Sequence, residues 1–153
     1  HDEALPPAAV LCGATNFPTI ARDTAGGLYL VNSAHLLQGR TPKGPYQVYV
    51  NYSKDGGHTW GPSVQVSKGG SNAFPWHTAG SSGRAGVAWY HANEEGEKNT
   101  YLFDDLNHAE FDVQVAQSID ASVAKPHYAL VTASQHPIKY GANCTSDTTL
   151  PAT

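Results

Sequence analysis

The sequence predicts an all-β protein built from antiparallel strands, and three observations favour this fold class. Glycine (15 residues) and proline (10 residues) are frequent in the 153-residue chain, and only 14 % of residues are charged. This composition is typical of short strands joined by tight turns. Segment 46–52 alternates with the period of two expected of a half-buried strand. The third observation is that a pattern of four strands occurs twice along the chain.

The repeat begins with two strands and the turn between them. Segments 16–23 and 28–32 are strand-like, and Thr24–Gly27 has the composition of a turn. The same order returns 57 residues later in segments 72–79 and 84–90. These segments predict the first and second strands of two similar units.

The third and fourth strands are repeated as well. Val48–Asp55 is echoed 65 residues later by Val113–Asp120, and short fourth strands are expected near 64–66 and 128–132. The longer interval gives the second unit eight extra residues between its second and third strands. The chain therefore divides into a lead-in segment, two four-stranded units, and the start of a further unit or a tail. These parts are 1–14, 15–68, 69–134 and 135–153.

The octapeptide at residues 53–60 joins the third and fourth strands of the first unit. Its two glycines can adopt the positive φ of a tight turn, and its aspartate can accept hydrogen bonds from nearby backbone N–H groups. Five residues fill the fixed positions of Ser-x-Asp-x-Gly-x-Thr-Trp, the Asp-box or bacterial neuraminidase repeat: Ser53, Asp55, Gly57, Thr59 and Trp60. The chain thus resembles the Asp-box β-propellers of the sialidase-like superfamily.

The resemblance implies that the box is structural, not catalytic, and lies at the turn between the third and fourth strands of a propeller blade. The second unit keeps Ser118 and Asp120 but has Ala121, Ser122 and Lys125 in place of the glycines and tryptophan, which makes a degenerate box. Propellers close with typically four to eight blades, so two blades and the start of a third form an incomplete ring. We therefore expect a piece of a larger propeller, or a chain that assembles with copies of itself, with an apolar sheet face open at each end.

Loops at the end opposite the box are the candidates for ligand binding. In an antiparallel unit the first–second and third–fourth turns share one end, and the second–third loops lie at the other. The expected loops 35–45 and 91–110 are long, and long loops on a rigid scaffold commonly carry binding sites. In the family that the chain resembles, the active site also lies away from the boxes. The candidate residues on this face are His35, Arg40, His91, Asp104 and Asp105.

Several of these candidates also have plainer interpretations. His35 and His91 are either ligand contacts or surface histidines with satisfied hydrogen bonds. The carboxylates of the second loop would suit glycoside hydrolysis, which needs a pair, but a solvated acidic loop is the preferred interpretation. Asp104 and Asp105 offer oxygen ligands to calcium without the spacing of a calcium loop. Metal-binding histidine spacings are missing, so the sequence predicts neither a metal nor a cofactor.

Catalysis by this chain alone is not expected. The sialidases that it resembles hold the substrate carboxylate with three converging arginines, a task suited to the planar guanidinium. The chain has three arginines, and only Arg40 falls on the candidate ligand face, since Arg22 and Arg84 lie near the turns at the box end. The Arg-Ile-Pro motif of that family is missing as well.

Two further sets of residues leave alternatives open. Trp76, Trp89 and Tyr90 lie on expected strands and are predicted to be core residues, with sugar stacking as the alternative. Cys12 and Cys144 stand near opposite ends of the chain. They are either joined in a disulfide that closes a very long loop or unrelated thiols.

The leading functional hypothesis is a catalytically incomplete propeller segment that binds a glycan or a protein. One alternative is a fragment of an exo-sialidase or other glycoside hydrolase whose catalytic residues lie in missing blades. Another is a scaffold or self-association module. A net charge of −4 argues against nucleic acid as a partner, and no apolar run approaches the ~20 residues of a membrane-spanning helix. The resemblance implies a secreted or cell-surface location.

Overall fold

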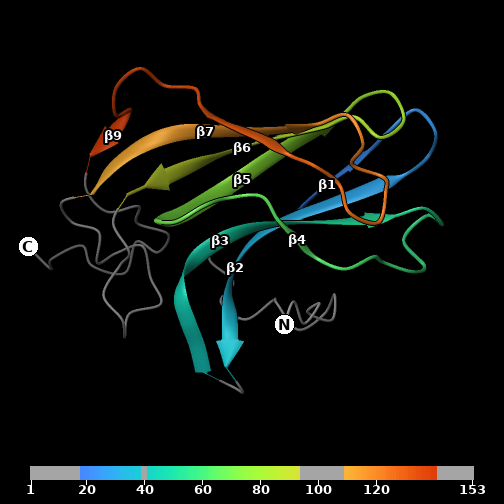
Figure 1. Ribbon diagram of the computed structural model, residues 1–153, viewed down its shortest axis with the longest axis horizontal. Coiled ribbons are helices and arrows are strands. Elements are labelled where there is room, and N and C mark those ends of the chain that lie inside the picture. Colours follow the sequence, from blue (N-terminus) through green and yellow to red (C-terminus); the bar gives the residue numbers. More distant parts are fainter. Residues whose placement is uncertain (1–17, 39–40, 94–108, 141–153) are drawn as a thin grey trace, which may run out of the picture.

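A computed structural model describes residues 18–38, 41–93 and 109–140 of the chain. Within these residues the backbone forms nine strands and no helix (Figure 1). The strands are β1 (Thr19–Arg22), β2 (Leu28–Gln38), β3 (Thr41–Ser53), β4 (Val64–Gln65), β5 (Ser71–Ala79), β6 (Ala85–Ala92), β7 (Glu110–Ser118), β8 (Ala129–Thr132) and β9 (Lys139–Tyr140). The all-β class predicted from the sequence is confirmed for this part of the chain.

The strands form two antiparallel sheets, each of which follows the order of the chain. The first sheet has the order β1-β2-β3-β4 and the second has the order β5-β6-β7-β8, with β9 paired to β7. Each sheet is thus a meander in which neighbours in sequence are neighbours in space. The first sheet lies within the first predicted unit, and β5 to β8 lie within the second.

Four turns lie at one end of the two sheets, which we call the turn end. They comprise residues 23–27, 54–63, 80–84 and 119–128. Hydrogen bonds join neighbouring turns, since the Thr24 amide donates to the Gly80 carbonyl at 3.0 Å and the Ala121 amide donates to the Gly83 carbonyl at 2.8 Å. The prediction that these turns share one end is confirmed.

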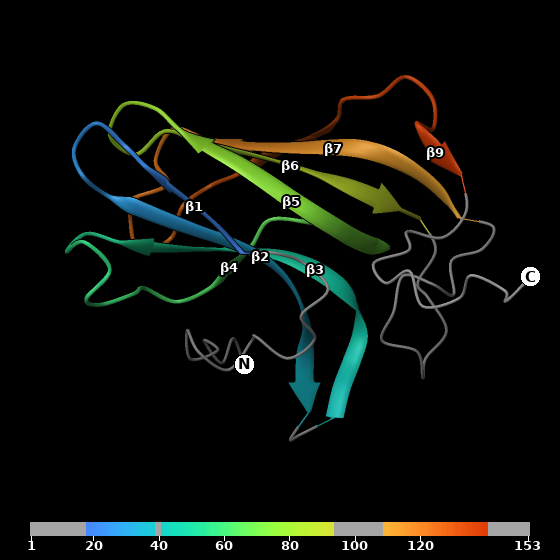
Figure 2. The ribbon, with the colours of Figure 1, turned by 180° about the vertical axis from the view of Figure 1, so that it is seen from behind.

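The first sheet is strongly curled, and the far part of its β2–β3 hairpin bends away from the second sheet (Figures 1 and 2). Its register shifts between Ala34 and Leu36, and pairing then continues to Gln38 and Thr41. The prediction of a loop over residues 35–45 is therefore wrong. Proline and glycine favoured a loop there, but this part of the hairpin extends past β1 and β4. Among the described residues neither strand has a second neighbour there, so a proline need not interrupt a ladder.

One face of the first sheet packs against the second sheet and forms the main core. The buried residues include Val31 and Val50 from the first sheet and Val87 and Trp89 from the second. A row of directly paired residues crosses the first sheet on this face, and we call it the first-sheet row: Thr19, Val31, Val50 and Val64. The repeat places its counterpart, the second-sheet row, at Trp76, Ala88, Val115 and Val131.

The second-sheet row does not face the first sheet. Successive residues of a strand point to opposite faces, so Ala88 lies on the face opposite to Val87 and Trp89. Trp76 is 72 % exposed and Val131 is 58 % exposed, whereas Val31 and Val50 of the first-sheet row are buried. The two sheets therefore stack head to tail, because the two units present opposite faces to their common contact.

The register also explains the burial of the aromatic residues. Trp89 points into the core and is buried, as predicted. Tyr90, on the other face, is half-buried, with its ring centroid 6.3 Å from that of Phe74. The prediction that Trp76 is a core residue is wrong, because its strand position turns it to the side away from the first sheet.

Candidate functional site

The loop that follows β3 is closed by its own side chains. The Ser53 hydroxyl donates to Asp55 Oδ1 at 2.8 Å and accepts from the Gly57 amide at 2.9 Å. Asp55 also accepts from the Thr59 amide at 2.8 Å and from the Thr59 hydroxyl at 2.6 Å. These hydrogen bonds hold the pKa of Asp55 well below its usual value. The two from Thr59 have the largest effect, and the one from Ser53 adds to it. The carboxylate is therefore committed to holding the turn together.

The loop between β7 and β8 repeats the centre of this arrangement. The Ser118 hydroxyl donates to Asp120 Oδ1 at 2.7 Å, and the Asp120 amide donates to Ser118 Oγ at 3.1 Å. The His127 amide then donates to Asp120 Oδ1 at 3.0 Å. The hydrogen bond from Ser118 has the largest effect on the pKa of Asp120, which it lowers, and the hydrogen bond from the His127 amide lowers it further. The same Ser–Asp pair thus closes equivalent turns of both sheets, although the second loop lacks the glycines of the first.

Asp23 connects the turns of the two sheets. Its carboxylate accepts from the Gly27 amide at 2.8 Å, from the Ala25 amide at 3.0 Å and from the Tyr29 hydroxyl at 3.0 Å. The Gly83 amide of the second sheet donates to it at 3.2 Å. Burial raises the pKa of Asp23, but the hydrogen bonds outweigh burial and the net pKa is lowered. A single side chain therefore ties the first turn of each sheet together.

A buried polar cluster lies at the end of the sheets opposite the turn end. Asn72 is fully buried; its amide nitrogen donates to the Tyr46 carbonyl at 3.0 Å, and its amide oxygen accepts from Trp89 Nε1 at 2.7 Å. His91 Nδ1 lies 3.0 Å from the same oxygen, and the Ser33 hydroxyl donates to the Asn72 carbonyl at 2.6 Å. These contacts join β2, β3, β5 and β6, so the cluster is a structural junction.

The predicted ligand-face residues are only partly described by the structure. His35 and His91 lie away from the turn end but are 5 % and 6 % exposed, so the interpretation of surface histidines is wrong. His35 Nδ1 lies 2.6 Å from the Gly44 carbonyl oxygen, its ring centroid lies 3.7 Å from that of Tyr46, and burial lowers its pKa. Both histidines are packed into the fold, where a ligand in solvent has little access to them. Arg40, Asp104 and Asp105 lie outside the described side chains.

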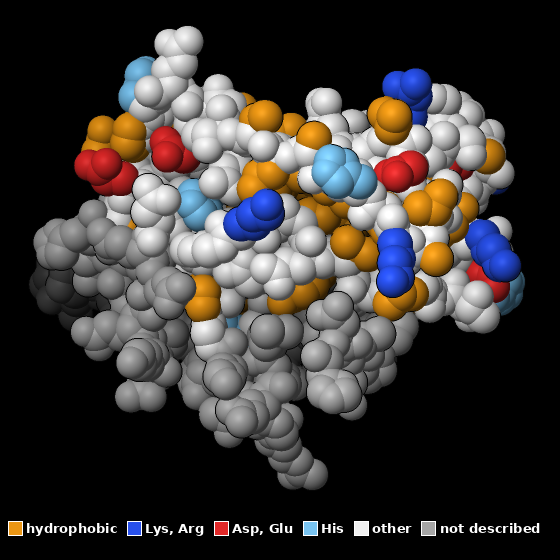
Figure 3. Space-filling model, in the orientation of Figure 1, with side chains coloured by type: hydrophobic (Ala, Val, Ile, Leu, Met, Phe, Trp, Pro, Cys, Tyr) orange, Lys and Arg blue, Asp and Glu red, His pale blue; other side chains and the backbone are white. Residues whose placement is uncertain are grey.

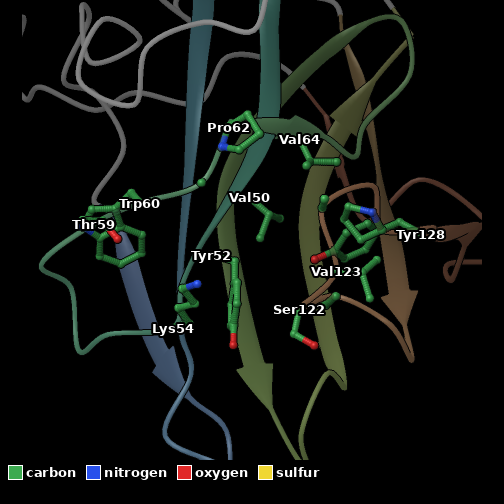
Figure 4. Close-up of a pocket in the computed structure, with 14 residues that line it drawn as sticks. Val50, Tyr52, Lys54, Thr59, Trp60, Pro62, Val64, Ser122, Val123 and Tyr128 are labelled. Carbon is green, nitrogen blue, oxygen red and sulfur yellow. The ribbon is translucent and has the colours of Figure 1, made fainter.

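A groove of about 350 Å³ opens at the turn end between the two Ser–Asp loops, and we call it the turn-end groove. The loop after β3 contributes Lys54, Trp60 and Pro62, and the loop after β7 contributes Val123. Figure 4 shows Tyr52 between the side formed by Lys54 and Trp60 and the side formed by Ser122, Val123 and Tyr128. The cavity therefore depends on the contact between the two units.

The Tyr128 hydroxyl is a buried polar group in the wall of the turn-end groove. No described residue forms a hydrogen bond with it. Burial, followed by the nearby charge of Asp120, raises the pKa of Tyr128 to about 12. The hydroxyl is therefore protonated at neutral pH and has a hydrogen bond to offer.

Charge is sparse over the described surface. On the face in Figure 3, Lys, Arg, Asp and Glu side chains are scattered, and uncharged atoms make up most of the described surface. Arg22 and Arg84 are exposed beside the turns. No group of three or more His, Cys, Asp or Glu residues suited to a metal ion occurs among the residues that the structure describes. That part of the chain also contains no helix long and apolar enough to cross a membrane.

Comparison of the chain with protein-family models, with curated proteins and with solved structures found no match.

Two features of the site were missed by reasoning from the sequence. Asp23 was expected only as the end of a strand, although Asp is a common turn residue and Gly26-Gly27 follow three and four residues later. The turn-end groove has no local signal, because its walls come from segments 50–64 and 121–128, which only the packing of the sheets brings together.

Proposed function

We propose that the chain is a two-unit segment of a sialidase-like Asp-box β-propeller, catalytically incomplete by itself, which contributes to a glycan- or protein-binding surface. Residues 53–60 are the intact box in this proposal, and residues 118–125 are its degenerate copy. The Ser–Asp hydrogen bond at equivalent turns of both sheets supports this assignment. The choice of glycan or protein as ligand comes from the resemblance of the sequence.

The observation that carries the proposal is the head-to-tail stacking of the two sheets. Two repeats related by a two-fold axis would bury the same face of each sheet. Neither sheet would then keep that face free for contact with another unit. Here the first-sheet row is covered by the second sheet, whereas the equivalent Trp76 and Val131 remain exposed. A contact of this kind can be repeated by a third unit, as the blades of a propeller require.

Hydrolysis of a fluorogenic sialoside tests the catalytic half of the proposal. The two arginines that the structure describes, Arg22 and Arg84, are exposed beside turns, not gathered around a pocket with acidic partners. We expect the chain alone to release fluorophore no faster than buffer. Steady hydrolysis that scales with protein concentration would overturn the claim of catalytic incompleteness.

Self-association is the second candidate function, and the exposed Trp76 and Val131 favour it. A head-to-tail contact between copies would cover this face with the first sheet of the next copy. Sedimentation velocity should then show concentration-dependent oligomers that disappear in the Trp76→Arg variant. Ile138→Arg is the matched control, since Ile138 is also a partly exposed apolar residue but lies outside the second-sheet row. A monomer at all concentrations would exclude self-association and leave a further unit as the occupant of this face.

A further inference from the structure

The turn-end groove has the size and the lining of a small-molecule site. Its volume of about 350 Å³ falls within the range of ligand pockets in proteins. Three aromatic residues line it, Tyr52, Trp60 and Tyr128, together with proline and valine side chains. A flat apolar ring would fit such a lining, because aromatic faces and prolines offer contact area with little side-chain freedom to lose.

The charge of the groove is positive. Lys54 is the only charged residue among the described residues that line it. The two carboxylates nearby, Asp55 and Asp120, do not line it and are held inside their own loops by the serine and amide hydrogen bonds. A ligand with one negative charge would therefore complement the groove better than a neutral or cationic one.

Tyr128 belongs to the other wall of the groove. Its hydroxyl is buried from solvent without a hydrogen bond from the described residues, so the wall that it forms offers apolar contact and no polar one. In Figure 4 Lys54 and Tyr128 stand on opposite sides of Tyr52. The charged end of a ligand therefore belongs at the Lys54 side of the groove.

We propose that the turn-end groove binds small aromatic carboxylates. The ring lies against Tyr52 and Trp60, and the carboxylate lies at Lys54. This site is separate from the glycan- or protein-binding surface proposed for the opposite end, and it does not depend on that proposal.

The test uses 2-naphthoate and its neutral analogue 2-naphthamide as probes of the full chain. We expect 2-naphthoate to cause saturable chemical-shift changes at the amides of Thr59, Gly61 and Ser122, which line the groove. It should bind about fivefold more tightly than 2-naphthamide, the gain of one partly exposed ion pair. Absence of saturable shifts, shifts confined to the Trp76 face, or equal affinity for the two probes would overturn the proposal.

Variants separate the charge from the apolar cavity. Lys54→Gln should abolish the preference for the acid, while Lys68→Gln removes the same charge from an exposed residue outside the lining and should leave the preference intact. Val123→Glu places a negative charge on a half-exposed wall residue and should weaken binding of the acid more than binding of the amide. A preference for the acid that survives Lys54→Gln, or is lost equally in Lys68→Gln, would contradict the assignment.

Discussion

Trp76 and Thr19 occupy the same position in two equivalent rows of paired residues, but their surroundings differ. Thr19 lies at the contact between the sheets, where its hydroxyl is 2.7 Å from His77 Nδ1, whereas Trp76 is 72 % exposed. The difference follows from the head-to-tail stacking, in which the first sheet covers one face of the second and leaves the other open. Variants of residues on the covered face and on the open face should therefore differ in their free energy of unfolding.

Substitution of two tryptophans should separate the covered face from the open one. Trp89→Ala removes a buried indole and its hydrogen bond to Asn72, and should lower the free energy of unfolding by roughly 3–5 kcal/mol. Trp76→Ala should change it by less than about 0.5 kcal/mol, because the side chain is exposed. Urea unfolding of dilute protein measures both. A large loss for Trp76→Ala would mean that this face is covered in solution.

Two adjacent glycines offer a test of the packing at the start of β5. Gly69 and Gly70 both have positive φ, 60° and 54°, but a Cβ at Gly69 would meet no atom, whereas a Cβ at Gly70 would overlap the Ala92 carbonyl oxygen. Gly69→Ala should therefore lower the free energy of unfolding by about 1–2 kcal/mol, the penalty for placing a residue with a Cβ in the left-handed conformation. Gly70→Ala should cost at least about 2 kcal/mol more, since backbone has to move. Similar losses for both variants would contradict this local structure.

The fold should lose stability in mild acid because of His77. Its Nε2 lies 3.0 Å from the Tyr29 carbonyl oxygen and so carries the proton, while Nδ1 accepts from the Thr19 hydroxyl at 2.7 Å. Burial lowers the pKa of His77, although the contact with Tyr29 opposes this in part. Because the folded pKa lies below the unfolded value of about 6.5, the stability is present above pH 6.5 and is lost as pH falls towards the folded pKa.

Unfolding free energies measured from pH 7.5 down to about pH 5 would detect this loss. His35 contributes in the same direction, because burial lowers its pKa too. His77→Gln should reduce the slope of stability against pH, and the exposed His136→Gln should not change it. An unchanged slope in His77→Gln would show that this histidine is not buried in its neutral form.

Asp23 should matter more to stability than an ordinary surface carboxylate. Asp23→Ala leaves buried donors at Gly27, Tyr29 and Gly83 without their acceptor, and should cost about 3 kcal/mol. Asp112→Ala is the control, since Asp112 accepts one part-buried hydrogen bond from Ser134 and should cost about 1 kcal/mol or less. Equal losses in urea unfolding would argue against Asp23 as the link between the turns of the two sheets.

Reasoning from the sequence predicted the strands best where the pattern was local. Alternation in residues 46–52 and the glycine-rich turn after Ser53 predicted β3 and the turn that follows it. The extension of β2 and β3 was missed, because a strand without further neighbours can include Gly44 and proline. Local composition cannot reveal such an edge.

The burial of individual residues was harder to predict than their secondary structure. Trp76 and Trp89 are both strand tryptophans, and only the way that the two sheets stack determines which is covered. Asn72 and Asp23 were missed as buried polar residues because their partners lie on other strands and turns. The turn-end groove was missed for the same reason, since its walls come from segments 50–64 and 121–128, which are far apart in the sequence.

The most direct test of the central claim, that two repeats stack head to tail, is a set of nuclear Overhauser effects between assigned methyl and indole protons. Val31 and Val50 of the first-sheet row should show contacts to Val87 or Trp89, with which they share one core. Contacts from Val31 or Val50 to Val115 would instead mean that equivalent faces meet. That result would contradict the account, because the contact would be complete and no face would be left for a further unit.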